Sequence, residues 1–292
     1  MPFQAILRHD LRTLRSSWLV RLWLVGTVLL TFLVASSNWA RLQTAPLVAL
    51  LLVPYLVFPW FLVVMVLGVN PLSGVRLEAL ADGFLSRPIT RQEYLLAIWA
   101  ARVIIVLTAY LAVMVPAVAI VVLAKRPVPA DQVTLYGLIA AGGVVGLVLS
   151  FQVSLAFLVG TWLRRPLVAV VVLLFLWYPV NTVMDVFRLE AFSPISLSRA
   201  LPNLLRQPWP WLDQTDSNPV DALQIEALQQ QAANFLNILS GSAPARPRQP
   251  DGDFFADARY KDFSLLRIAL GYGLSTVAAV GLATLIFSLR DL

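Results

Sequence analysis

The sequence predicts an all-α integral membrane protein with six transmembrane helices, and three observations lead to this fold class. Of the 292 residues, 59% are hydrophobic and only 13% are charged, whereas ordinary soluble domains are about 45–50% apolar and about 25% charged. The mean hydropathy is +0.77. Six uncharged stretches of 19 residues or more are each long enough to cross about 30 Å of hydrocarbon. This composition excludes a conventional soluble enzyme.

The first element is an amphipathic helix over residues 2–17. Apolar side chains recur at helical spacing on one face, and arginines and the single histidine, His9, occupy the other. A basic amphipathic helix of this kind lies in the headgroup layer, where anionic lipids attract it. The alternative is a plain basic flank of the first span.

The predicted transmembrane helices cover residues 22–40, 45–69, 95–124, 133–163, 166–186 and 266–289. In lipid a spanning backbone must satisfy its own hydrogen bonds, which favours helices, and the continuous apolar runs do not alternate as β-barrel strands do. The first run could also be a secretory signal peptide, but its basic segment is long and no small-residue cleavage site follows, so an uncleaved span is favoured. The helices contain Pro54, Pro59, Pro116 and Pro179, which predict kinks, either hinges or rigid bends.

The orientation follows from the distribution of Lys and Arg. With the N-terminus inside, the inner segments hold 11 of these residues and the short outer loops hold three. Both termini are therefore expected in the cytoplasm, in a multi-pass protein of the cell (inner or plasma) membrane. The net charge of +6 is then an orientation signal, and no nucleic-acid partner is expected.

Residues 70–92 form the predicted cytoplasmic segment between the second and third spans. Pro88 blocks helix continuation, and Thr90 with Glu93 is a capping box that begins the next helix. We expect a short helix across the inner face here; an ordinary capped loop is the alternative.

This segment also carries a family resemblance, in the residues Glu78, Gly83, Phe84, Leu85, Ser86, Arg87, Pro88, Ile89, Thr90 and Arg91. It resembles the cytoplasmic loop of permease subunits of type-2 ATP-binding-cassette (ABC) transporters. The amphipathic first helix, the six spans and the large segment before the sixth span are similar to the same family. The resemblance implies a single permease domain over residues 1–292.

The resemblance further implies a coupling helix that docks on a separate ATPase subunit, present in two copies. The residues expected to make or position this contact are Leu77, Glu78, Leu80, Phe84, Leu85, Ser86, Arg87 and Pro88. The chain contains no G-x-x-x-x-G-K-[ST] motif, so ATP and Mg are expected on the partner subunit and no cofactor in this chain. A second permease chain, identical or different, would complete the pathway among the membrane lipids.

No catalytic or metal-binding residues are expected in this chain. Cysteine is absent and His9 is the only histidine, which removes the usual zinc ligands and leaves His9 as the sole base for a Ser–His nucleophile. An intramembrane enzyme is therefore disfavoured.

Polar and aromatic residues within the spans are candidates for a translocation path, because polar groups in a membrane usually face protein or water. These candidates are Tyr55, Phe58, Trp60, Gln152, Asn181 and Asp185. Asp185 can also be read as an interfacial residue, and the absence of a mid-membrane carboxylate argues against secondary transport. A stripe of small residues at Gly142, Gly146, Ser150 and Ser154 predicts close helix packing, within the chain or with another chain.

Residues 187–263 form a large external segment with expected re-entrant or lateral helices. The resemblance to type-2 ABC permeases implies short re-entrant helices just after the fifth span, for which residues 186–205 are the candidate. Capping and apolar spacing predict an amphipathic helix over residues 218–241; an external cap without cargo contact is the alternative. The predicted function is the membrane-spanning permease subunit of an ABC transporter, an exporter that acts as a dimer. The alternative is a non-transporting membrane scaffold or accessory subunit whose external segment binds a partner.

Overall fold

The computed structural model describes residues 2–69, 90–128, 131, 133–163, 165–186, 193–209 and 264–289. The predicted coupling contacts Leu77 to Pro88 and the predicted helix over residues 218–241 lie outside the described residues. Side chains are not described for residues 181–186, which include Asn181 and Asp185.

The described chain is helical throughout, with no strand, which confirms the all-α prediction. Its helices are α1 (Pro2–Ser16), α2 (Trp18–Asn38), α3 (Thr44–Leu56), α4 (Trp60–Val69), α6 (Arg91–Leu123), α7 (Leu135–Trp162), α8 (Pro166–Val186), α9 (Pro194–Leu205) and α11 (Leu265–Ser288).

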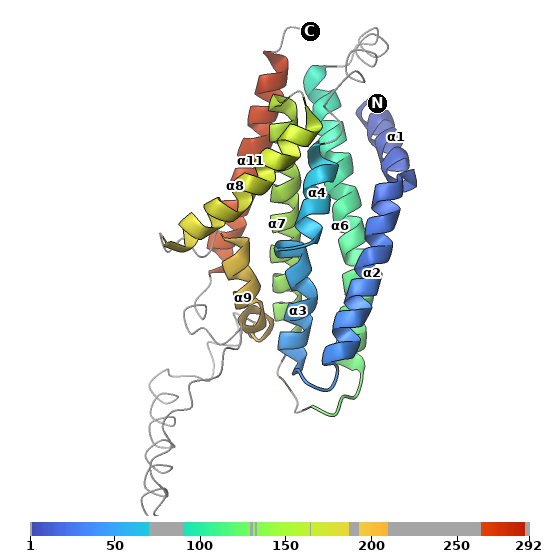
Figure 1. The fold of residues 1–292 in the computed structure, drawn as a ribbon, viewed down its shortest axis with the longest axis vertical. Helices are drawn as coiled ribbons and strands as arrows, with labels where there is room; N and C mark the ends of the chain where they lie inside the picture. Colours follow the sequence, from blue (N-terminus) through green and yellow to red (C-terminus); the bar gives the residue numbers. More distant parts are fainter. Residues whose placement is uncertain are drawn as a thin grey trace, which may run out of the picture.

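Five stretches in the described residues are long and apolar enough to cross a membrane: Trp18–Asn38, Thr44–Val69, Gln92–Leu123, Leu135–Trp162 and Leu265–Ser288. The predicted fifth span, over residues 166–186, coincides with α8, whose apolar described part, Pro166–Trp177, is shorter than the other five. The six-span count therefore stays a prediction. Figure 1 shows α8 crossing the bundle obliquely, unlike the other long helices.

The predicted helix over residues 45–69 is interrupted, and the break divides it into α3 and α4. Pro54 is accommodated inside α3, whereas residues 57–59 are not helical. Proline lacks the backbone N–H that continues a helix and its ring crowds the preceding turn, so Pro59 separates the two helices where only a kink was predicted.

Helix α7 is the centre of the bundle. It packs against α3, α4, α6, α8, α9 and α11, and α1 lies along the first turns of α6. Helix α1 and the last turns of α11 lie at one end of the bundle, here called the N-terminal end; α9 and the first turns of α3 and α7 lie at the other, here called the α9 end (Figure 1).

At the N-terminal end, α4 and α7 approach through glycines. A Cβ added at Gly68 would lie 2.5 Å from the Ala156 Cβ, and one at Gly160 would lie 3.0 Å from the Val69 Cα. Only a hydrogen in place of the side chain allows this distance between the two backbones. The α9 end has one comparable contact, where a Cβ on Gly137 would meet the Leu205 backbone.

Candidate functional site

A buried polar cluster joins α1, α4 and α6 at the N-terminal end. The Arg102 side chain on α6 is only 5% exposed, and its guanidinium donates a hydrogen bond to the Leu67 carbonyl oxygen. Leu67 lies in the last turn of α4, where carbonyls have no partner inside the helix. A cation suits this position because it also faces the negative end of the helix dipole.

The acidic member of this cluster is Asp10 on α1. Its carboxylate lies 4.0 Å from the Arg102 guanidinium, and burial raises the pKa of Asp10, against the opposing effects of Arg102 and then His9. The ion pair therefore partly offsets the cost of removing the carboxylate from water.

From the sequence, Asp10 and Arg102 count only among the charges of the inner segments, and no contact between them is predicted. A signal for Asp10 was present, because Ile6, Asp10 and Leu14 follow one another at four-residue spacing, and the structure buries Ile6 and Leu14. An acidic residue in line with two buried apolar residues points toward the neighbouring helix. Nothing comparable in the sequence marks Arg102 as the partner.

The cluster joins the two helices that flank the predicted coupling segment, α4 before it and α6 after it. Helix α4 ends at Val69, which packs on Gly160 of α7. Helix α6 begins with the predicted capping box: the Glu93 N–H donates to the Thr90 Oγ1 at 3.3 Å, and the Thr90 N–H donates to the Glu93 Oε2 at 3.4 Å. Arg102 thus links the helix that enters the segment to the helix that leaves it.

The candidate path residues described by the structure do not line one open route. Tyr55 is 1% exposed and meets Tyr110 of α6 edge to face, with ring centroids 4.9 Å apart. Trp60 packs on Trp23 of α2, with centroids 6.5 Å apart, and Phe58 in the α3–α4 break is exposed. In this conformation the aromatic residues hold α2, α3, α4 and α6 together.

Gln152 on α7 is completely buried. Neither atom of its side-chain amide has a hydrogen-bond partner among the described residues. An unpaired buried amide is costly, because the group loses its hydrogen bonds to water without replacement. Among the candidate path residues, Gln152 therefore stands out: the described residues around it offer nothing that offsets the cost of burying its amide.

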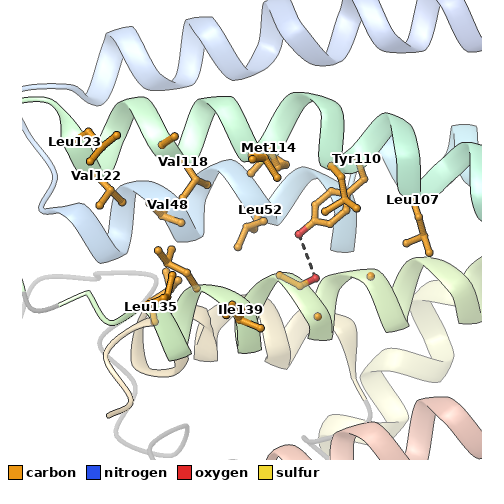
Figure 2. Close-up of a pocket in the computed structure, with 18 residues that line it drawn as sticks. Val48, Leu52, Leu107, Tyr110, Met114, Val118, Val122, Leu123, Leu135 and Ile139 are labelled. Atoms are coloured by element: carbon orange, nitrogen blue, oxygen red, sulfur yellow. Dashed lines mark hydrogen bonds between the residues drawn. The ribbon is translucent and has the colours of Figure 1, made fainter. Parts of the chain in front are cut away.

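The small-residue stripe of α7 faces α6 of the same chain. In its half toward the N-terminal end, the Trp99 Nε1 of α6 donates to the Ser154 Oγ at 2.8 Å, and the Ser154 and Ser150 hydroxyls donate back along α7 to the carbonyls of Ser150 and Gly146. In the other half the Tyr110 hydroxyl donates to the Gly142 carbonyl at 3.3 Å. From Leu107 and Gly146 toward the α9 end, the two helices line a groove (Figure 2).

The comparison with known families settles what kind of protein carries this arrangement. Residues 83–292, most of the chain, match the family described as "ABC-2 family transporter protein". The chain belongs to the ABC-2 transporter family. No curated protein and no solved structure matches it.

Membership confirms the resemblance seen in the sequence and makes the protein a permease, the membrane component of an ABC transporter. The matched region begins at Gly83, so it contains the predicted contacts Phe84 to Pro88, whereas Leu77, Glu78 and Leu80 precede it. The permease family is a transport component and not itself catalytic, and it implies an ABC ATPase as partner. In the described part of the permease, no group of three His, Asp or Glu side chains could hold a metal ion.

The permease also has a polar cluster at the α9 end, which the sequence did not predict. The Arg206 side chain, just after α9, donates to both carboxylate oxygens of Asp131 at 3.0 and 3.2 Å. The same carboxylate accepts the Ala45 backbone N–H at 2.8 Å, at the start of α3. Asp131 thereby joins the α6–α7 loop to α3 and α9.

Proposed function

We propose that this permease is the membrane-spanning subunit of an ABC exporter, paired with a second permease chain and driven by two separate ATPase subunits. The observation that carries the proposal is the Arg102 cluster, which connects the two helices flanking the coupling segment in a chain of the ABC-2 family. The sequence contains no P-loop. ATP and Mg would therefore bind to the partner subunits.

In this proposal the N-terminal end faces the cytoplasm, as the excess of Arg in the inner segments favours. The ATPase would contact the coupling segment through Leu77, Glu78, Leu80 and residues 84–88. A displacement of the segment would act on α4 through Val69 and on α6 through its N-cap residue, Thr90. Because Arg102 holds the end of α4 against α6 and α1, these helices would move together.

The path between two such chains would open and close by this motion, without covalent chemistry. Tyr55 and Gln152 are closed off by packing in the described conformation. Either side chain could reach a path only if α3, α6 and α7 changed their packing. In this proposal the cargo leaves the path at the α9 end, which faces the outside, so the permease acts as an exporter.

The decisive experiment combines the wild-type permease, purified from its native membrane, with the ABC ATPase that copurifies with it. We expect stable binding and an ATPase rate that rises with the permease, and expect the Glu78→Ala/Arg87→Ala variant to lose both. Arg41→Ala is the matched control, because Arg41 is exposed in the α2–α3 loop. The proposal is wrong if no ATPase copurifies, or if the Glu78→Ala/Arg87→Ala variant still binds it as the wild type does.

The orientation is tested separately, and the absence of native cysteine makes the test simple. Arg8→Cys on α1 and Arg41→Cys are both exposed positions, at opposite ends of the bundle. In intact cells a membrane-impermeant maleimide should label Arg41→Cys and leave Arg8→Cys unlabelled until the membrane is opened. The reverse pattern would invert the proposed orientation.

A further inference from the structure

The groove between α6 and α7 at the α9 end has no role in the mechanism proposed above. It has a volume of about 710 Å³, within the range of about 300–1,000 Å³ that small-molecule sites occupy. Helix α6 forms one wall, α7 forms the other, and Val48 and Leu52 of α3 form the floor (Figure 2).

The lining of this groove is apolar from end to end. The Tyr110 hydroxyl, which reaches into it, already donates to the Gly142 carbonyl. The rims are large exposed side chains, among them Val115 at 60% and Ile139 at 62% exposure. A hydrocarbon chain fits such a lining better than water does, because the lining offers water no free hydrogen-bond partners.

The groove is at least as long as the hydrocarbon of one leaflet of a bilayer. Its lining residues run from Leu107 to Leu123 on α6 and from Leu135 to Gly146 on α7, which correspond to about 24 Å and about 17 Å at about 1.5 Å per residue. Half of a hydrocarbon core of about 30 Å is about 15 Å. A groove that begins at the α9 end and has this length can hold an acyl chain along its whole extent.

The mouth of the groove at the α9 end is basic. Lys125, Arg126 and Arg206 lie next to the lining residues Leu123 and Leu205, and Asp131 is the single carboxylate of the α6–α7 loop. Asp131 is occupied by Arg206, and Arg126 donates to the Leu42 carbonyl and the Thr44 hydroxyl. Lys125 is exposed and has no carboxylate within ion-pair distance among the described residues, so its ammonium is available to a phosphate.

We propose that this groove is a phospholipid site, which holds one acyl chain of an anionic phospholipid from the leaflet at the α9 end. The phosphate lies beside Lys125, and the chain runs between α6 and α7 past Gly143 and over Leu52. This leaflet is the outer one if the proposed orientation holds. The site itself does not depend on the orientation, the ATPase or the cargo.

The test is native mass spectrometry of the full chain, released from nanodiscs that contain equal amounts of phosphatidylglycerol and phosphatidylcholine. The wild type should retain one phospholipid per chain, enriched in phosphatidylglycerol. Gly143→Leu should reduce retention at least about tenfold, because its side chain displaces several methylenes and each buried methylene is worth roughly a factor of four in binding. A Cβ on Gly143 meets nothing within 4 Å, so the variant should fold.

Two further variants complete the test. Gly273→Leu on α11 is the matched control, since a Cβ there also meets nothing within 4 Å, and it should retain lipid as the wild type does. Lys125→Gln should still retain a lipid but lose the preference for phosphatidylglycerol. Equal lipid retention by Gly143→Leu and the wild type would overturn the site. So would a Gly143→Leu variant in which the number of chains per particle changes while the number of bound lipids does not, since the groove would then be an interface between chains. An unchanged preference in Lys125→Gln would overturn the assignment of the phosphate to Lys125.

Discussion

The two ends of the bundle are built on different principles. At the N-terminal end, α4 and α7 are in backbone contact at Gly160 and Val69, and the buried Arg102 side chain lies between three helices beside the half-buried Asp10. At the α9 end, α7 is also in backbone contact with the end of α9, at Gly137 and Leu205, but α6 and α7 separate around a groove of about 710 Å³. In the ion pair at this end the Asp131 side chain is buried, whereas the Arg206 side chain is 40% exposed.

The difference shows where the permease is rigid and where its packing leaves space. The N-terminal end joins the helices that flank the coupling segment, and a close-packed joint transmits displacement because it has no free volume to absorb it. The α9 end encloses free volume along α6 and α7, which allows a ligand or a change in helix packing. Four predictions test this contrast, from the largest expected effect to the smallest.

The first prediction concerns the backbone contact between α4 and α7 at Gly160. Gly160→Val should destabilise the permease by at least about 3 kcal/mol, since overpacking against a backbone cannot be relieved by rotating a side chain. The Tm in detergent measures it. Gly146→Ala is the matched control on the same helix: its Cβ would lie 3.5 Å from the Leu107 Cδ2, an ordinary contact, and its Tm should stay the same or rise. A similar loss in both variants would remove the distinction between the two ends.

The second prediction concerns the buried ion pair. Asp10→Ala leaves the Arg102 guanidinium buried without its carboxylate and should cost about 2–4 kcal/mol. Arg12→Ala, an exposed arginine on the same helix, should change stability by less than about 0.5 kcal/mol. A double-mutant cycle with Arg102→Leu isolates the pair, and a coupling energy near zero would show that Asp10 does not stabilise Arg102.

The third prediction is a pH dependence that arises from Asp10. Burial raises its pKa in the folded chain above the ordinary aspartate value of 3.8, so between the two pKa values the folded state binds more protons than the unfolded state. The stability contributed by this group is therefore fully present below about pH 4 and is lost as the pH rises through the folded pKa, by at most about 1.4 kcal/mol per pH unit. The unfolding midpoint in denaturant, compared between wild type and Asp10→Asn across pH 4–7, measures it. Parallel pH profiles would contradict it.

The fourth prediction concerns the Arg206–Asp131 pair at the α9 end, in which the carboxylate side chain is buried and the arginine is exposed. Arg206→Ala should cost less than about 1 kcal/mol, because water solvates the arginine and screens the pair. Asp131 keeps the Ala45 N–H as a partner, so its carboxylate remains satisfied. The Tm of Arg206→Ala should lie well above that of Asp10→Ala. The reverse order would mean that the α9 end stabilises the bundle more than the buried cluster does.

Much of the local structure could be predicted from the sequence. The capping box of α6 is present as predicted, and α1, α7 and α11 begin and end within two residues of their predicted ranges. Hydrophobic length and capping depend on residues close together in the chain, so they can be read without knowledge of the fold. The sequence indicates a disturbance of the predicted helix over residues 45–69 but not the position of the break at residues 57–59. Pro54 and Pro59 both lie within the apolar run, and only Pro59 interrupts the helix.

The candidate site was less accessible to sequence reasoning. The small-residue stripe predicts close packing at Gly142 and Gly146, within the chain or with another chain. Within the described chain both line the groove, and the closest backbone contacts of glycines fall on Gly68, Gly137 and Gly160. A glycine in an apolar helix permits a close approach, but which helix lies opposite it depends on the whole bundle.

The sequence by itself determined the membrane class, the helical elements and the resemblance to the ABC-2 family, since these follow from composition, period and a short motif. Only the tertiary structure decided that Asp10 faces Arg102, that Asp131 joins α3 to Arg206, and that α6 and α7 part to leave a groove. These contacts connect residues that are 75 or more positions apart. Their formation depends on how helices pack in three dimensions, and no local pattern in the chain encodes that packing.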